Sequence, residues 1–173
     1  MQLVLGNIVE MRTDAIAAPA HSDLRPIPGI SEAIFAAADR KRLTEACAQA
    51  GRCKIGKTVI TPSCGLPCRY IIHVVGPGWY GGHKAERLLF ANSYLQALHK
   101  ARAYHCRSVA LPLMFSGEFH LPRAQALDIV CRVVTEFERT HTTPEVYLVL
   151  YKESIYQLAE TVYRRVLDET GSR

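Results

Sequence analysis

Residues 14–39 read "DAIAAPAHSDLRPIPGISEAIFAAAD" and contain, in order, a strand, a loop and the start of a helix. The run "DAIAAPA" is continuously apolar, which is typical of a strand inside a sheet whose two faces are both covered. Ser31 suits the cap or first turn of a helix, and the spacing after it predicts one helix over residues 31–49. A helix N-terminus that follows a strand in this way is a natural seat for phosphate. The loop that leads to it is stiffened by Pro26 and Pro28.

Apolar strands and amphipathic helices alternate through the rest of the chain. The other strands are predicted over residues 3–8, 57–63, 69–77, 108–114 and 145–151. Further helices are predicted over residues 84–104, from Pro122 through Phe137, and from Ile155 through Val166. This order predicts a single domain over residues 1–173, a three-layer α/β/α fold with a mixed central sheet.

Composition and charge exclude several classes of protein. The chain has 173 residues, of which 49% are hydrophobic and 21% charged, as is ordinary for a globular domain. It holds no run approaching the roughly 20 apolar residues of a membrane helix. Its first residues lack a basic lead and apolar core, so we expect no secretory signal and a cytoplasmic location. The net charge of +5 would suit a polyanion, but Lys and Arg are not interleaved with aromatics, so the sequence does not favour nucleic acid.

Six cysteines raise the question of a zinc site or disulfides. Cys64 and Cys68 are separated by three residues rather than two, and no second pair completes a set of four ligands. Cys47, Cys106 and Cys131 lie in apolar helical or helix-end contexts, where free cysteine acts as a small hydrophobe. We therefore predict a structural role for all six and neither metal nor cofactor, with a redox role of the first pair as the alternative.

Four segments follow the predicted strands: "GNI", "HSDLRPIPGI", "MFSGEFHLP" and "YKES". Each is rich in small, polar or aromatic residues, which plain connections do not need. In open α/β sheets, ligands bind in a crevice at the carboxyl ends of the strands. The sequence therefore predicts one cleft lined by these four segments.

Several stretches resemble macrodomains, the modules that bind ADP-ribose. "GNIVEMRTDAIAAPAHSDL" is similar to the opening of the family, "YIIHVVGPGWYGG" to its Ile-His-Thr-Val-Gly-Pro-x-Trp stretch, and "VALPLMFSGEFHLP" to its second loop. The likeness covers nearly the whole chain in the right order. It implies a macrodomain fold, and in it the best-matched histidine, His73, is expected to be a core residue.

The resemblance implies a set of ligand-binding residues in the predicted cleft. Asn7 replaces the aspartate that accepts a hydrogen bond from adenine, and Tyr151 matches the aromatic residue that packs on the adenine ring. Ser116 and Gly117 match residues whose backbone N–H groups hold the distal phosphate, and Phe119 matches the aromatic residue over the distal ribose. The full expected set is Asn7, Ile8, Gly29, Ile30, Ser31, Ser116, Gly117, Glu118, Phe119 and Tyr151.

The opening phosphate loop departs from the family pattern. Ile27 and Pro28 take the place of two glycines, and Pro28 has no backbone N–H to donate. Glu32 replaces the last glycine and is expected to set a carboxylate beside any diphosphate. The expectation is a divergent macrodomain that binds ADP-ribose or a related adenine nucleotide, with weakened affinity.

Two alternatives to a binding module remain open. Family hydrolases use an Asn and an acidic residue where this chain has His21 and Ser31. A substitute acid–base set of His21, Glu32, Glu118 and His120 could remove ADP-ribose from a protein or an acyl group from acyl-ADP-ribose. The other alternative is a scaffold without ligand that acts through protein or nucleic-acid contacts. The partners implied by the resemblance are ADP-ribose and, for a reader or hydrolase, ADP-ribosylated protein.

Overall fold

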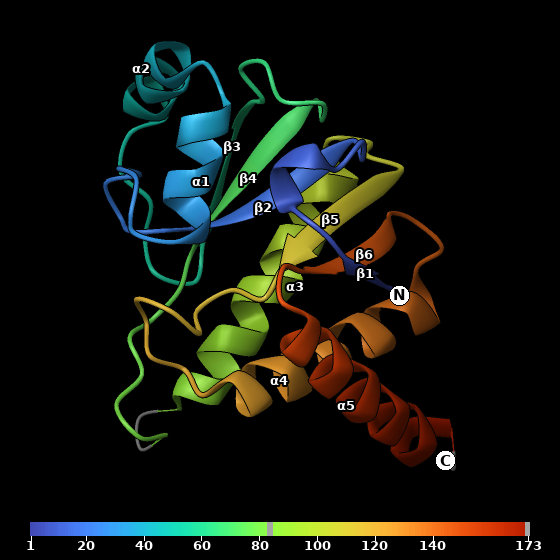
Figure 1. Ribbon diagram of the computed structural model, residues 1–173. Helices are drawn as coiled ribbons and strands as arrows, with labels where there is room; N and C mark the ends of the chain where they lie inside the picture. The colour runs from blue at the N-terminus through green and yellow to red at the C-terminus, as the bar shows by residue number, and fades with distance from the viewer. Residues whose placement is uncertain (83–84, 172–173) are drawn as a thin grey trace.

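The computed structural model describes residues 1–82 and 85–171 and forms a six-stranded sheet between two groups of helices (Figure 1). The strands are β1 (Gln2–Leu5), β2 (Ala15–Ala20), β3 (Thr58–Pro62), β4 (Tyr70–Val75), β5 (Ser108–Pro112) and β6 (Glu145–Leu150). The helices are η1 (Ile8–Glu10), α1 (Ile30–Ala37), α2 (Arg40–Ala50), α3 (Glu86–Ala103), α4 (Arg123–Thr140) and α5 (Glu153–Gly171).

The sheet has the order β1-β6-β5-β2-β4-β3. All neighbouring strands are parallel except β3, which pairs antiparallel with β4, so the sheet is mixed as predicted. Because β1, β6, β5, β2 and β4 are parallel, their carboxyl ends lie at one edge. The loops that follow them therefore meet there.

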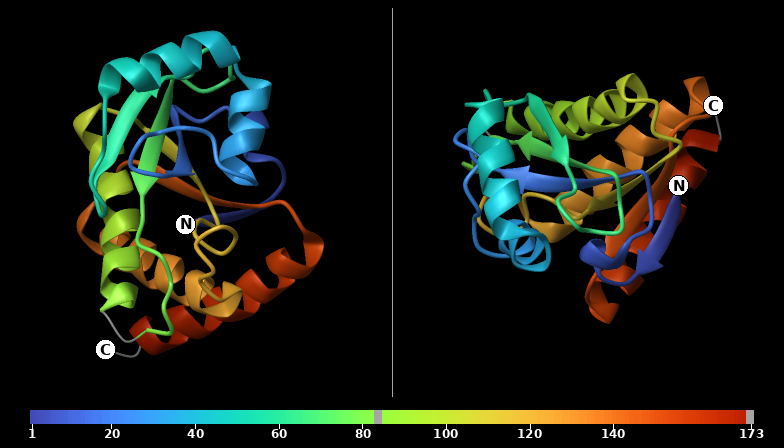
Figure 2. Two further views of the ribbon diagram at one scale, coloured as in Figure 1. Left: turned by 90° about the vertical axis from the view of Figure 1, so that its left-hand side faces the viewer. Right: turned by 90° about the horizontal axis from the view of Figure 1, so that it is seen from above.

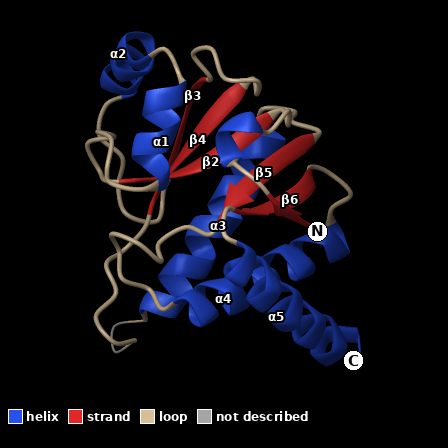
Figure 3. Ribbon diagram, in the orientation of Figure 1, coloured by secondary structure: helices blue, strands red, loops and turns tan. Residues whose placement is uncertain are grey.

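Two hydrophobic clusters account for the three layers. Ala15 and Ala17 of β2 belong to a cluster with α3, α4 and α5, whereas Ile16, Ala18 and Ala20 pack in a second cluster with α1 and α2. Side chains alternate between the two faces of a strand, and here both faces are covered by helices, which is why this strand is apolar throughout. Figure 2 and Figure 3 show the two helix groups on opposite sides of the strands, which confirms the predicted α/β/α fold.

The predicted helix over residues 31–49 is in fact two helices. Ala38 is extended, with a ψ of 170°, and the Asp39 side chain accepts a hydrogen bond from the Arg42 N–H (3.1 Å), which caps α2. The Asp39 N–H also donates to the Cys64 carbonyl (2.7 Å). An aspartate before a helical run is a start signal, and here its capping bond overrides the apolar spacing on which a single helix was based.

Two other elements, the first strand and helix α3, were predicted with longer bounds than the structure has. The first strand ends at Leu5 instead of residue 8, because Asn7 caps the short helix η1 by accepting from the Val9 N–H (3.3 Å). Helix α3 begins at Glu86, and the predicted start at Lys84 lies outside the described residues.

The polar residues of the core agree with structural roles. His73 is 1% exposed, its Nε2 lies 3.0 Å from the Thr61 hydroxyl, and burial lowers its pKa to about 4, so it is neutral at physiological pH. All six cysteines are buried and free, and burial raises the pKa of Cys47 and of Cys68 to about 11. They therefore pack as small apolar side chains. No helix among the described residues is long and apolar enough to cross a membrane.

Candidate functional site

A pocket of about 560 Å³ lies at the carboxyl ends of β1, β2, β5 and β6. Each of the four predicted segments contributes to its lining: Asn7 after β1, Gly29 after β2, Gly117 after β5 and Tyr151 after β6. The volume lies within the range of pockets that hold cofactor-sized ligands. The sheet topology thus brings together segments that are up to 144 residues apart (151 − 7).

The segment after β2 reaches the pocket through a turn that only glycine adopts easily. Gly29 has a φ of 92° and stands at the N-cap of α1, where no side chain caps the helix. Ile27 and Pro28 line the pocket beside it. The first N–H groups of a helix have no intrahelical acceptor. In α1 the Glu32 N–H donates to the Ile27 carbonyl (2.9 Å), which leaves the N–H groups of Ile30 and Ser31 for an anion in the pocket.

Successive side chains of α1 point in different directions, so only some of the residues that follow Gly29 face the pocket. Ile30 and Ala33 line the pocket, whereas Ser31 is buried and its hydroxyl accepts a hydrogen bond from the Ile27 N–H (3.4 Å). Glu32 does not line the pocket. Its carboxylate pairs with Arg40 of α2 at 2.6 Å, and this contact lowers its pKa. The structure therefore differs from the expectation that Glu32 opposes a bound diphosphate, because helix geometry turns the side chain toward α2.

The Glu32→Gln variant tests this arrangement. We expect it to change the affinity for ADP-ribose by less than about two-fold, since an exposed carboxylate that is already paired contributes little beyond its partner. Calorimetric titration against the wild type measures the effect, with Glu160→Gln on α5 as a charge-matched control. A clearly tighter complex for Glu32→Gln alone would place its carboxylate near the ligand after all.

The segment between β5 and α4 is held by a buried tyrosine. The Tyr94 hydroxyl accepts a hydrogen bond from the Met114 N–H (2.8 Å) and lies 3.3 Å from the Met114 carbonyl, to which it donates. Phe115 has a φ of 71° and its carbonyl accepts from the Leu121 N–H (3.0 Å), which closes the loop. A side chain at Gly76 would clash with the Phe115 ring, so the Gly-Pro turn after β4 permits this packing.

Tyr94→Phe tests how much the two hydrogen bonds between Tyr94 and Met114 stabilise the protein. The change leaves the Met114 N–H and carbonyl buried without a partner, which should lower the free energy of unfolding by about 1–3 kcal/mol. Urea unfolding measures the loss. Tyr104→Phe is the matched control, because Tyr104 is 42% exposed and its loss of a hydroxyl should cost little. Equal stabilities of the two variants would contradict the assignment.

The proposed acid–base residues do not come together in the pocket. Glu118 lines it, and the His21 ring lies 5.3 Å from the ring of Phe119, measured between centroids. His120 is exposed, has a φ of 60° and does not line the pocket. Glu32 pairs with Arg40, as described above. Of the set His21, Glu32, Glu118 and His120 expected from the sequence, Glu118 lines the pocket and the other three do not.

The pocket also contains an aromatic ring and an amide. Tyr151 is 76% exposed and lines the pocket with Asn7 and Ile8. Asn7 uses its side-chain oxygen to cap η1, at 3.3 Å from the Val9 N–H. Because a carbonyl oxygen has two lone pairs, it can still accept a second hydrogen bond from a ligand.

Two cations in the pocket were missed by sequence reasoning. Arg123, the first residue of α4, and Lys152, just before α5, both line the pocket. Neither belongs to a motif, and only the topology shows that they face the same cavity. A signal did exist, since Lys152 lies within the strand-end segment "YKES" and Arg123 directly follows the segment "MFSGEFHLP".

The fold and the pocket together define a class: a three-layer α/β domain with a ligand-sized cavity at the strand ends, bordered by a helix N-terminus and a glycine-containing loop. The Macro domain family model matches residues 17–130. The chain belongs to the macrodomain family.

Known relatives extend over nearly the whole chain. The chain is 38% identical to the O-acetyl-ADP-ribose deacetylase of Salmonella newport (strain SL254), covering 99% of this chain and 96% of that protein. It is 37% identical to a macro domain-containing protein of Methanosarcina mazei, covering 94% and 87%. Among solved structures, the Oceanobacillus iheyensis macrodomain with ADP has a TM-score of 0.91 at 26% identity, covering 96% and 91%. A mutant of that macrodomain has been solved with ADPR.

Proposed function

We propose that the pocket binds ADP-ribose or a related adenine nucleotide. The observation that carries this proposal is the meeting of all four strand-end segments around one cavity of about 560 Å³. The structures of the Oceanobacillus iheyensis macrodomain with ADP and with ADPR support the choice of ligand.

Each part of the ligand has a matching part of the pocket in this proposal. Asn7 and Tyr151 hold adenine, and the backbone N–H groups of Ser116 and Gly117 hold the distal phosphate, as the family resemblance implies. The N-terminus of α1 contacts the diphosphate, and Phe119 covers the distal ribose. Arg123 and Lys152 add positive charge that attracts the diphosphate.

We expect the affinity to be modest for a member of this family. Pro28 cannot donate a hydrogen bond, and Ile27 is bulky where the chain passes close to phosphate. Asn7 is neutral, so its bond to the adenine amino group is weaker than one from a carboxylate. The proposed role is that of a reader of ADP-ribose, free or attached to protein.

Calorimetric titration with ADP-ribose, AMP and NAD tests the proposal. ADP-ribose should bind at least about ten-fold more tightly than AMP, because AMP lacks the distal phosphate and ribose, and ten-fold corresponds to about 1.4 kcal/mol. Absence of heat with ADP-ribose, confirmed by unchanged thermal stability at millimolar ligand, would favour the scaffold alternative.

A second candidate function is removal of an acyl group from O-acyl-ADP-ribose. The name O-acetyl-ADP-ribose deacetylase, shared by relatives that are 37–38% identical across 99% of this chain, favours it. Glu118 in the pocket and His21 against Phe119 are the residues that could supply acid–base chemistry.

A further inference from the structure

A second cavity, of about 590 Å³, lies at the amino-terminal edge of the sheet, where β5 and β6 begin. Its walls come from the last turns of α3, the α3–β5 loop and Thr143 ahead of β6. Four of the residues that line it are His99, Arg102, His105 and Arg107. This edge is opposite to the edge that holds the first pocket, because both pairs of strands run parallel.

The two arginines in this cavity lack the acidic partners that most other arginines have. Seven arginines in the described residues form ion pairs with carboxylates: Arg25, Arg40, Arg69, Arg87, Arg132, Arg139 and Arg165. No such pair forms at Arg102 or Arg107 within residues 1–82 and 85–171. The nearby Asp14 accepts from the backbone N–H of Arg107 (2.7 Å) and lies 3.8 Å from Arg69.

The pKa of His99, which lines the cavity, is lowered by its surroundings. Burial lowers the pKa of His99, and the charges of His141 and Arg102 lower it further. The His99 and His141 rings lie 5.9 Å apart, and each also contacts the Phe137 ring, so the three rings form one cluster. The guanidinium groups of Arg102 and Arg107 line this hollow without an ion pair among the described residues, although the Asp14 carboxylate accepts from the Arg107 backbone. Such unpaired cations favour an anion that binds from outside.

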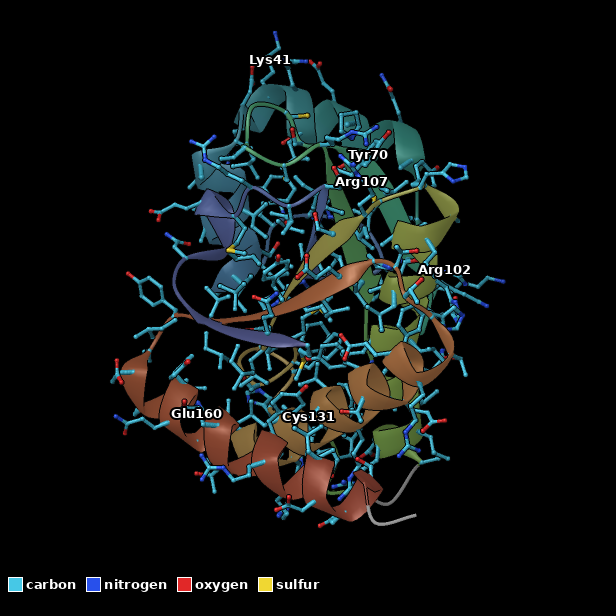
Figure 4. All side chains as sticks on the ribbon, turned by 90° about the vertical axis from the view of Figure 1, so that its right-hand side faces the viewer. Lys41, Tyr70, Arg102, Arg107, Cys131 and Glu160 are labelled. Carbon is cyan, nitrogen blue, oxygen red and sulfur yellow. The ribbon has the colours of Figure 1, made fainter. Side chains whose placement is uncertain are left out.

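Aromatic rings lie next to these cations. Tyr104 is 42% exposed, and its ring meets the ring of Tyr70 edge to face at 5.6 Å. The Arg69 guanidinium lies 5.2 Å from the centre of the Tyr70 ring. Figure 4 shows Tyr70, Arg107 and Arg102 along one flank of the molecule. Two short segments, residues 69–70 and 102–107, therefore bring basic and aromatic residues together on this side of the sheet.

The macrodipole of α3 accounts for only part of this arrangement. Lys100 and Arg102 lie in the last turn of α3, where cations offset the negative end of the helix. The same effect does not explain Arg107, which begins the approach to β5, or the exposed ring of Tyr104. A basic groove with adjoining aromatic rings is the usual arrangement for binding single-stranded nucleic acid.

We propose that this edge of the sheet binds single-stranded nucleic acid, with backbone phosphates between Arg102 and Arg107 and a base stacked on Tyr104. The contacts are to phosphate and to the face of a base, so binding is tolerant of sequence. The site is separate from the ADP-ribose pocket, and its occupation does not depend on the function proposed for that pocket.

Fluorescence anisotropy of a labelled 12-nucleotide RNA of mixed sequence tests the proposal across a series of salt concentrations. The double variant Arg102→Gln, Arg107→Gln should bind at least about ten-fold more weakly. Its slope of log affinity against log salt should be shallower by about 1.4, since each lost phosphate contact removes roughly 0.7 for single strands. Tyr104→Ala should weaken binding about five-fold or more through lost stacking.

The matched control is Lys57→Gln with Arg164→Gln, which removes the same charge from positions that do not line the cavity. It should stay within about two-fold of the wild type in RNA affinity, and circular dichroism should show that all variants are folded. The proposal fails if the wild type does not bind the RNA at low salt or if both double variants weaken equally. It also fails if ADP-ribose displaces the RNA. Competition by inorganic polyphosphate with no effect of Tyr104→Ala would reduce the site to an anion site and overturn the assignment to nucleic acid.

Discussion

Gly117→Val should abolish measurable ADP-ribose binding, with a loss of at least about 100-fold, or roughly 2.7 kcal/mol, while leaving the fold intact. Gly117 lines the pocket in the segment after β5, and a Cβ built at this position contacts nothing within 4 Å. The folded protein therefore has room for the side chain. A phosphate held by the backbone N–H groups of Ser116 and Gly117 would clash with that side chain, because the added carbons prevent the close approach that glycine permits.

The expected loss of affinity follows from the hydrogen bonds to phosphate that the variant would lose. A hydrogen bond to a charged group contributes about 1.5–3 kcal/mol, so the loss of one or two phosphate contacts reaches the expected value. Calorimetry measures affinity, and thermal melting measures stability. Gly171→Val, at the end of α5, is the control, because its Cβ also meets nothing within 4 Å and it does not line the pocket. Unchanged affinity in Gly117→Val would show that the distal phosphate lies elsewhere.

The strands and the strand-end segments could be predicted from the sequence because both are local signals. The apolar run of β2 reports burial on two faces, which the two hydrophobic clusters confirm. The division of residues 31–49 into α1 and α2 was less accessible. The residue that caps α2, Asp39, could be read from the sequence. Its backbone position, however, is also held by a hydrogen bond from its N–H to the carbonyl of Cys64, a residue 25 positions away (64 − 39).

The direction of each side chain in the site could not be predicted in the same way. The sequence places Glu32 near the phosphate loop, yet one position along a helix rotates a side chain by about 100°, and Glu32 faces Arg40 instead. Arg123 and Lys152 carry no motif and become site residues only because β5 and β6 are neighbours. Likewise, Arg69 and Arg107 approach Asp14 through the topology alone.

We expect the wild-type protein to hydrolyse O-acetyl-ADP-ribose at least about 100-fold more slowly than the Salmonella typhimurium deacetylase in the same assay, because positioned acid–base groups typically supply 10²–10⁴ in rate. His21 and Ser31 occupy the places where, by resemblance, hydrolases of the family carry an Asn and an acidic residue. Ser31 is buried and accepts a hydrogen bond from the Ile27 N–H, so its hydroxyl is committed to the loop.

Within the described part of the chain, no hydrogen bond joins the two substitutes that remain, His21 and Glu118. Among the described residues that line the pocket, Glu118 is the only carboxylate. The His21 ring contacts the Phe119 ring, with 5.3 Å between their centroids. An imidazole and a carboxylate that are not joined by a hydrogen bond give little of the acid–base advantage. Rapid deacetylation by the wild type would contradict this reasoning. If Glu118→Gln or His21→Ala then removed the activity while ADP-ribose affinity stayed within a few-fold, the pair would act as a catalytic unit, and the protein would be a hydrolase with its own acid–base set.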